Sequence, residues 1–455
     1  MNFRPVSEPG SFRDPSSRIV HDGERILRLL DQRGARAWHA LARTSFFEDA
    51  VARHRLIATR EVGDAPPGVS AVLEHPRLPL ITYPYEWTFS MLRDAALLQL
   101  DLLSDALGEG LTMKDATPFN IQFVDARPIF IDVGSFDLYQ PGDPWIGYRQ
   151  FTRQFLFPLL LRAWADVPFQ PWLRGRLQGP TARDMRQILS LRRRLTPSAF
   201  AHITLQAQLE RKVSGPTRDR LQKAGFSLGL ILANVRRLRR LIERLRWSPS
   251  RTAWTDYASH PHVAQDRSTK IRFLREAIES VAPALVLDLG ANDGTYCRVV
   301  AEHGCRVVAL DADESVLDRV YQSAPAHGIS VVLCDVTDPS PSQGWRNRER
   351  PDIFDRIRPE LVIAYGLIHH LLYKASIPLR EIVEWLRSFG CPIVVEFVEP
   401  DDPLVRVITA DKKPWEVHPE RTDAQFRALA GHGFSVARWR ALPSGHRHLY
   451  ILVPH

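Results

Sequence analysis

A short glycine-rich turn between a buried strand and a helix constrains the fold of this chain more than any other feature. An apolar run over 285–289 predicts a buried parallel strand, Gly290-Ala-Asn-Asp-Gly294 follows it directly, and the next segment, 295–303, predicts a helix. Glycine lets the backbone approach a ligand without a Cβ in between, and a helix N-terminus attracts negatively charged groups. This order predicts a doubly wound α/β sheet with a nucleotide-like ligand at the carboxyl ends of its strands.

Further apolar segments continue this pattern towards the end of the chain. Asp288 lies at the end of the first predicted strand, and the next two strands end in Asp311 and Asp335. Carboxylates at these places suit a ligand with a positive centre, a ribose and an adenine. A pyridine nucleotide is the alternative, although enzymes that bind it prefer Gly-x-Gly-x-x-Gly in the turn. The later strands are predicted over 305–310, 329–334, 360–364, 391–396, 434–442 and 448–453, with a helix over 377–389.

Residues 265–455 resemble the class I S-adenosylmethionine-dependent methyltransferases. The resemblance rests on Asp288-Leu-Gly-Ala-Asn-Asp-Gly294, Asp311, Cys334-Asp-Val336 and His369-His370-Leu371, and on the terminal strand pair. It implies a mostly parallel seven-stranded sheet, S-adenosylmethionine as the cofactor, and no metal. The cofactor contacts that it implies are Asp288, Gly290, Asn292, Gly294, Asp311, Ala312, Asp335 and Val336.

Candidate catalytic residues follow the fourth and fifth predicted strands. His369 and His370 come after the fourth, where a histidine can deprotonate a hydroxyl near neutral pH. Glu396, after the fifth, is an alternative base. The Asn/Asp-Pro-Pro-Tyr/Phe motif of enzymes that methylate base amino groups is absent, and Ala364-Tyr-Gly-Leu367 stands in its place. These features favour O-methylation of a small molecule or glycan over the alternative, an RNA or tRNA methyltransferase.

A second group of polar residues lies in the first half of the chain. Asp115 precedes Asn120 by five positions, and Asp132 opens an Asp-x-Gly twelve positions later, after a predicted hairpin. This pattern resembles the catalytic half of protein-kinase-like and aminoglycoside-phosphotransferase-like folds. The resemblance implies that Asp115 orients an acceptor hydroxyl, while Asn120 and Asp132 hold magnesium. A long helix is predicted over 88–107 and a strand over 78–85.

The first half also departs from the phosphotransferase pattern. Met113 replaces the usual histidine, and no lysine precedes Lys114. These departures favour a degenerate kinase-like module that recognises the methyl acceptor. The alternative from another class is a kinase-like phosphotransferase whose C-terminal half senses S-adenosylmethionine.

Length and composition set the domain organisation. The 455 residues exceed one ordinary domain. We predict an α+β domain over 1–180, an arginine-rich helical connector over 181–250 with a linker at 248–252, and a methyltransferase domain over 251–455. On a helix predicted over 267–280, Lys270 is expected near the mouth of the cofactor site, as is Tyr257 upstream.

The remaining composition bears on location and partners. No apolar run reaches the ~18–20 residues of a membrane span, the N-terminus lacks a signal-peptide core, and the four cysteines lack metal-ligand spacing. We therefore expect a cytoplasmic protein. The net charge of +8, with 53 arginines, indicates either an anionic partner such as RNA or an arginine-rich composition without functional meaning. The even spread of arginines favours the second, so a nucleic-acid partner is possible but not favoured, and no motif bears on oligomeric state.

Over its full length the chain resembles a group of bacterial two-part methyltransferases that includes host-specific nodulation proteins. The resemblance implies a two-domain bacterial enzyme and does not identify the acceptor. The matching segments are Tyr85-Glu-Trp-Thr-Phe-Ser-Met-Leu92, Lys114-Asp-Ala-Thr-Pro-Phe-Asn-Ile-Gln122, Ile131-Asp-Val-Gly-Ser135 and Glu396-Phe-Val-Glu-Pro-Asp-Asp-Pro403.

Overall fold

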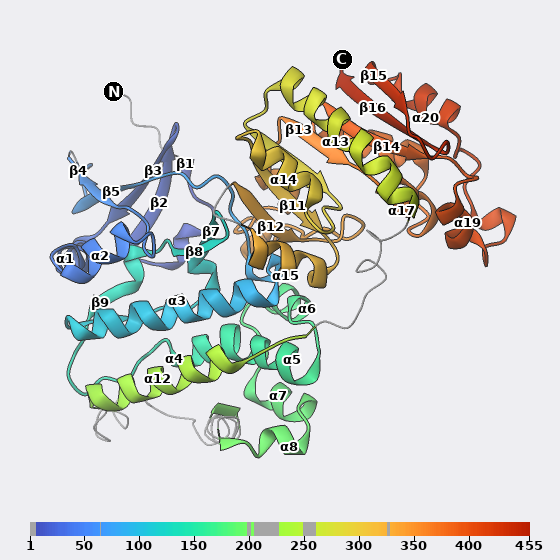
Figure 1. Cartoon of the computed structure of the whole chain (residues 1–455). Coiled ribbons are helices and arrows are strands. Elements are labelled where there is room, and N and C mark those ends of the chain that lie inside the picture. The colour runs from blue at the N-terminus through green and yellow to red at the C-terminus, as the bar shows by residue number, and fades with distance from the viewer. Residues whose placement is uncertain (1–5, 64, 198–201, 204–226, 249–260, 325–327) are drawn as a thin grey trace. The chain divides into compact units, whose positions relative to one another are not determined.

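The computed structural model of the chain forms two compact units (Figure 1). It describes all residues except 1–5, 64, 198–201, 204–226, 249–260 and 325–327. The N-terminal unit comprises Met1–Ser248 together with Pro341–Asp352, and the C-terminal unit comprises Pro249–Ser340 and Ile353–His455. Most of the predicted linker at 248–252, and Tyr257, lie outside the described residues. Among the helices that the structure describes, none has the length and apolar character to cross a membrane.

An antiparallel five-stranded sheet begins the N-terminal unit. Its strand order is β1-β2-β3-β5-β4, and Val20, Leu27 and Val72 pack together as its apolar core. Two helices lie between β3 and β4 in the chain. The elements are β1 (Val6–Ser7), η1 (Ser11–Arg13), β2 (Ser17–Asp22), β3 (Arg25–Leu30), α1 (Gln32–Ala42), α2 (Ser45–Ala52), β4 (Arg60–Val62) and β5 (Ala71–His75).

A 20-residue buried helix, α3 (Phe89–Gly108), forms the centre of the rest of this unit. The Thr88 side chain caps its N-terminus by accepting from the Met91 amide. Two short antiparallel pairs, β6–β9 and β7–β8, follow α3. The segment 78–85, predicted as a strand, is not one: it runs without regular structure into η2, and Pro79 and Pro84 remove amide donors that a strand would need. The elements are η2 (Pro84–Glu86), β6 (Leu111–Met113), η3 (Pro118–Asn120), β7 (Ile121–Val124), β8 (Arg127–Phe130), η4 (Val133–Ser135) and β9 (Phe136–Leu138).

Helices complete the N-terminal unit. The arginine-rich helix predicted in the middle of the chain is observed as α12 (Leu228–Arg244), and its buried apolar side chains face α3. Those side chains are Ile231, Val235, Leu238 and Ile242. The other helices are α4 (Tyr148–Phe151), the π-helix η5 (Thr152–Leu156), α5 (Phe157–Ala165), α6 (Gln170–Gly175), α7 (Ala182–Ile188) and α8 (Leu191–Arg194).

The C-terminal unit contains the predicted seven-stranded sheet. Its order is β12-β11-β10-β13-β14-β16-β15, in which the first five strands are parallel and β16 and β15 join antiparallel. The strands are β10 (Leu285–Leu289), β11 (Arg306–Asp311), β12 (Ile329–Leu333), β13 (Leu361–Ala364), β14 (Ile393–Val398), β15 (Phe434–Ala441) and β16 (Arg447–Pro454). From β10 the chain adds β11 and β12 on one side and then β13 and β14 on the other. Doubly wound sheets bind ligands at the point where this direction changes.

Helices alternate with these strands along the chain. They are α13 (Pro261–Val281), α14 (Thr295–Glu302), α15 (Glu314–Ser323), η8 (Trp345–Asn347, in the segment assigned to the N-terminal unit), α16 (Ile353–Arg356), α17 (Ile368–Tyr373), α18 (Leu379–Ser388), α19 (Pro403–Thr409), η9 (Pro414–Glu416) and α20 (Asp423–Ala430). The parallel strands are almost wholly buried, as expected for a sheet with helices on both faces.

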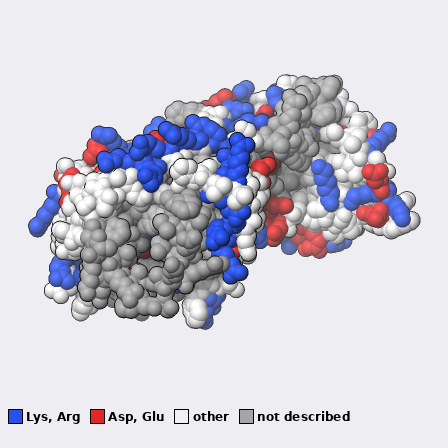
Figure 2. Space-filling model, turned by 90° about the horizontal axis from the view of Figure 1, so that it is seen from below, with Lys and Arg blue, Asp and Glu red and all other residues white. Residues whose placement is uncertain are grey.

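Many of the arginines are neutralised by acidic neighbours. Figure 2 shows Lys and Arg side chains gathered over part of one face, with few Asp and Glu side chains among them. Arg239 of α12 lies 2.6 Å from Asp101, and Arg25 and Arg60 both pair with Glu74. The exposed arginines of α12 are Arg236, Arg237, Arg240 and Arg244.

Candidate functional site

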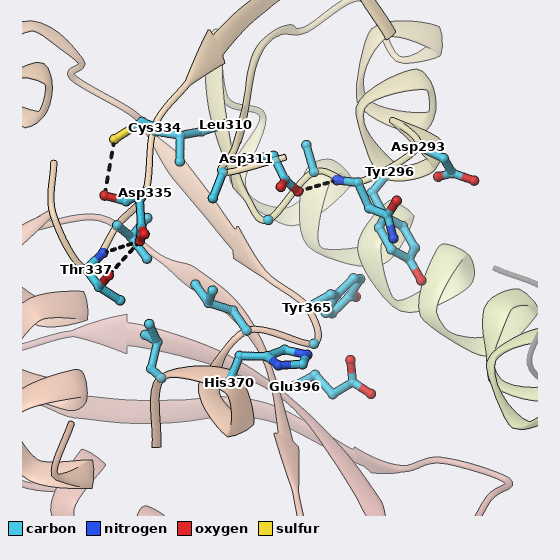
Figure 3. Close-up of a pocket in the computed structure, with 18 of the residues that line it drawn as sticks. Asp293, Tyr296, Leu310, Asp311, Cys334, Asp335, Thr337, Tyr365, His370 and Glu396 are labelled. Atoms are coloured by element: carbon cyan, nitrogen blue, oxygen red, sulfur yellow. Dashed lines mark hydrogen bonds between the residues drawn. The ribbon is translucent and has the colours of Figure 1, made fainter. Parts of the chain in front are cut away.

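A cavity of about 430 Å³ opens at the carboxyl ends of β10, β11, β12 and β13 (Figure 3). The loop after each of these strands contributes to its wall, because the strands are parallel and their carboxyl ends meet at one edge of the sheet. Six of the eight predicted cofactor-binding residues line it: Gly290, Asn292, Asp311, Ala312, Asp335 and Val336.

The glycine-rich turn after β10 has three residues with positive φ. Gly290 and Gly294 adopt φ values of +80° and +71°, and Asn292 lies at +45°. The amide of Asn292 donates to the Asp311 carboxylate at 2.9 Å, and the amide of Gly290 donates to the Leu310 carbonyl at 2.8 Å. These bonds tie the turn to the end of the neighbouring strand.

Asp311 and Asp335 present carboxylates at the ends of adjacent strands. Burial raises the pKa of Asp311, although it accepts hydrogen bonds from the backbone amides of Asp313 and Asn292. Asp335 is exposed and accepts from the amide and the hydroxyl of Thr337 at 2.9 and 2.7 Å. The two side chains lie on the cavity wall (Figure 3) and can accept hydrogen bonds from a ligand.

Two of the predicted cofactor residues do not lie on the cavity wall. Asp288 is buried and accepts from the Cys297 thiol at 3.0 Å, and burial raises its pKa to about 7. Gly294 is the residue before α14, where a Cβ would come within 3.1 Å of Val320. Asp288 therefore contacts the helix after the turn, and Gly294 allows close packing against α15.

The three predicted catalytic residues are placed differently from one another. His370 lines the cavity, and burial lowers its pKa to about 3, so its imidazole is neutral at neutral pH. His369 is buried, 1% exposed, and is not among the lining residues. Glu396 lines the cavity but contacts Lys270 Nζ at 2.7 Å and Arg447 at 3.2 Å. Burial opposes ionisation of Glu396, yet these two cations outweigh it and lower the pKa.

Several lining residues were not predicted from the sequence. Tyr296 and Tyr365 meet edge to face with ring centroids 4.8 Å apart, and Leu367 and Leu371 add apolar wall. Tyr365 directly follows β13, so its position after a buried strand was a usable signal. Tyr296 was hidden inside a helix whose amphipathic pattern does not single it out.

The second group of polar residues also comes together, in the N-terminal unit. The Asn120 amide nitrogen lies 3.3 Å from Asp132, and Ser135 donates to the same Asp132 oxygen. Asp115 lies close enough to be influenced by this charge: its pKa is raised, first by burial and then by Asp132.

An arginine occupies the position next to Asp132. Arg28 of β3 is buried and lies 2.8 Å from the other Asp132 oxygen, and it also contacts Ser17 and His75. Both oxygens of Asp132 therefore have protein partners. A cavity of about 10 Å³, room for about one water molecule, is lined by Arg28 and Gly134 but not by Asp132.

One curated protein aligns with nearly the whole chain. The nodulation protein NoeA of Rhizobium meliloti (strain 1021) is 32% identical over 468 residues, which cover 98% of this chain and 96% of NoeA. The chain belongs to the NoeA family. No protein-family model matches it.

Solved structures similar to this NoeA-family chain match less than half of it. Magnesium protoporphyrin IX methyltransferase ChlM from Synechocystis PCC 6803, with bound S-adenosylhomocysteine, has a TM-score of 0.31 and 15% identity, covering 49% of this chain and 94% of ChlM. N-methyltransferase NodS from Bradyrhizobium japonicum WM9, in complex with S-adenosylhomocysteine, has a TM-score of 0.32 and 14% identity, covering 44% and 91%. Likeness at this level does not bear on activity or substrate.

Proposed function

We propose that this protein is an S-adenosylmethionine-dependent methyltransferase. The observation that carries the proposal is one cavity that brings together the positive-φ turn at Gly290, Asp311 and Asp335 from three adjacent parallel strands. A turn without a Cβ at Gly290, a carboxylate beside it and a second carboxylate on the next strand fit an amino-acid chain, a ribose and an adenine in that order. No side chain on this wall needs a metal to play these parts.

The residues around the cavity suggest how methyl transfer would proceed. The bound cofactor supplies an electrophilic methyl group on a positively charged sulfur. Asp311 would accept from the ribose hydroxyls and Asp335 from the adenine amino group. Tyr296, Tyr365 and Leu367 would exclude water from the reacting centre.

We assign His370 as the residue that takes the acceptor proton. It lines the cavity, whereas the carboxylate of Glu396 is engaged by Lys270 and Arg447, and His369 is buried outside the lining. A neutral imidazole can accept the proton that a hydroxyl loses when its oxygen forms the bond to the methyl carbon. This assignment supports O-methylation of a small-molecule or glycan acceptor, and the nodulation in the name of the NoeA relative is the biological setting we propose.

The phosphotransferase alternative is less consistent with the N-terminal unit. Arg28 already occupies the space beside one Asp132 oxygen that a magnesium ion would need, and Ser135 and Asn120 contact the other oxygen. We therefore propose that the Asp115, Asn120 and Asp132 group stabilises a degenerate kinase-like module.

The cofactor site is tested by calorimetric titration of S-adenosylmethionine into the wild type and Asp311→Asn. We expect the variant to bind about 10- to 100-fold more weakly, since a hydrogen bond to a charged group contributes about 1.5–3 kcal/mol. Asp313→Asn is the matched control: Asp313 is two residues away, does not line the cavity, and caps α15, which asparagine can also do. Equal affinity in Asp311→Asn and the wild type would refute the assignment.

A further inference from the structure

A single buried lysine reaches the cavity from α13. Lys270 is 5% exposed, lines the cavity, and places its Nζ 2.7 Å from Glu396 and 5.8 Å from the centre of the Tyr365 ring. The Tyr365 hydroxyl donates to the Lys270 carbonyl at 3.2 Å, which fixes this turn of the helix against the end of β13. The ammonium is therefore held in one place on the wall.

Behind Lys270 lies a buried chain of alternating charges. Glu396 bridges Lys270 and Arg447, and Arg447 contacts Asp402 through two nitrogens at 2.8 and 3.2 Å. Glu396 and Arg447 are fully buried, and Asp402 is 1% exposed. Removing these four charges from water costs several kcal/mol per ion, which only good geometry offsets. Such a costly arrangement at a cavity wall suggests a role beyond stability.

The proposed cofactor carries a group that needs a cation. Its amino-acid part ends in a carboxylate, which is costly to bury without a positive partner. Among the described residues, the lysine and arginine side chains on the wall are Arg267, Lys270 and Lys374. Arg267 is 41% exposed and pairs with Asp293 at 3.6 Å, and Lys374 is exposed.

Lys270 matches this requirement best. Its ammonium has three donors, and Glu396 accepts from one of them at 2.7 Å. Arg267, one turn earlier on α13, reaches Asp293 in the glycine-rich turn, so this face of the helix adjoins the loop that would hold the amino-acid part. The Tyr296 and Tyr365 rings line the same part of the wall.

We propose that Lys270 binds the carboxylate of the cofactor, and that Glu396, fixed by Arg447 and Asp402, is the positioning residue for its ammonium. The proposal rests on the proposed function. It makes Glu396 a partner of Lys270, in place of the base that the sequence suggested.

Two ligands distinguish loss of the carboxylate contact at Lys270 from a general disturbance of the cavity. S-adenosylhomocysteine contains the amino-acid part, whereas 5′-methylthioadenosine shares the nucleoside and the sulfur but lacks it. In calorimetric titrations we expect Lys270→Met to weaken S-adenosylhomocysteine binding by about 10- to 100-fold and to leave 5′-methylthioadenosine binding within about twofold. Lys412→Met, at a half-buried lysine that does not line the cavity, should change neither affinity.

Two further variants test the positioning role and guard against misfolding. Glu396→Gln should lower the preference for S-adenosylhomocysteine less than Lys270→Met does, because the ammonium remains but is no longer fixed. The double variant Lys270→Met/Glu396→Gln removes one charge of each sign and keeps the Arg447–Asp402 pair, so it should fold and show the full loss of preference.

The outcomes distinguish a failure of the proposed function from a failure of the Lys270 assignment. A wild type that binds neither ligand would overturn the proposed function. A wild type that binds both, with the same preference for S-adenosylhomocysteine in the double variant, would overturn the role of Lys270 alone.

Discussion

At the scale of single residues, Asp288 was predicted to contact the cofactor, yet its buried carboxyl does not line the cavity. It lies one residue before the end of β10, but its side chain contacts Cys297 and does not line the cavity. A carboxylate without a cation partner is costly to bury, and burial accordingly raises the pKa of Asp288 to about 7. The protein is therefore expected to hold this carboxyl protonated below neutral pH.

This raised pKa predicts a pH-dependent stability. In the unfolded chain Asp288 ionises near its ordinary pKa of 3.8, whereas in the folded protein it keeps its proton up to about pH 7. Its favourable contribution is thus complete below about pH 4 and is lost as the pH rises to about 7. We expect Asp288→Asn, without cofactor, to gain unfolding temperature relative to the wild type as the pH is raised from 4.5 to 8. Parallel curves for the two proteins in thermal unfolding would contradict the raised pKa.

Sequence reasoning found the polar residues of the site better than the apolar ones. Asp311, Asp335 and His370 follow buried strands, and strand ends can be recognised from apolar runs alone. Tyr296 reaches the wall from a helix, where position on the face depends on how the helix packs, whereas Lys270 lines the cavity as expected from the sequence. The partners of Glu396 lie at residues 270 and 447, far apart in the chain, so no local pattern could have shown that it is ion-paired.

At the scale of elements, the turn between β10 and α14 depends on its two glycines for different reasons. Gly290 has no atom within 3.8 Å of where a Cβ would lie, so the space there is open for a ligand. At Gly294 a Cβ would come within 3.1 Å of Val320 on α15. The second glycine therefore permits close packing of α14 and α15 as well as a positive φ.

A pair of alanine substitutions separates these effects. Gly304, at the end of α14, has a similar φ of +77° but no atom within 4 Å of its Cβ position. Gly304→Ala should cost only the backbone strain, about 1–2 kcal/mol. We expect Gly294→Ala to cost more, because the contact with Val320 is added to the strain. Denaturant unfolding of both variants measures the difference, and equal losses would rule out the packing role.

Strand periodicity predicted the sheet of the C-terminal unit well and the N-terminal unit less well. The five buried parallel strands are continuous apolar runs, which is a strong signal. The segment 78–85 is also apolar, yet its prolines keep it out of a sheet. In the N-terminal unit, the pairing of Arg28 with Asp132 joins residues about a hundred positions apart and could not be read from spacing.

At the scale of the whole molecule, the net charge of +8 does not by itself indicate a nucleic-acid partner. Several arginines are paired with acidic side chains, although positive side chains also gather over part of one face in Figure 2. That the arginine content reflects composition more than a polyanion site therefore stays a prediction.

The two units differ in whether their clustered carboxylates are free to meet a ligand or already contact protein side chains. In the C-terminal unit, Asp311 and Asp335 face a cavity of about 430 Å³. In the N-terminal unit, Arg28, Ser135 and Asn120 already contact both oxygens of Asp132. This contrast predicts that the chain binds S-adenosylmethionine and not a magnesium nucleotide.

Parallel calorimetric titrations of S-adenosylmethionine and of magnesium-ATP into the full-length protein test this prediction most directly. We expect saturable binding of S-adenosylmethionine, no heat from magnesium-ATP, and the same S-adenosylmethionine affinity in Asp132→Asn. Binding of magnesium-ATP that is lost in Asp132→Asn, together with no binding of S-adenosylmethionine, would contradict the account and place the chemistry in the N-terminal unit.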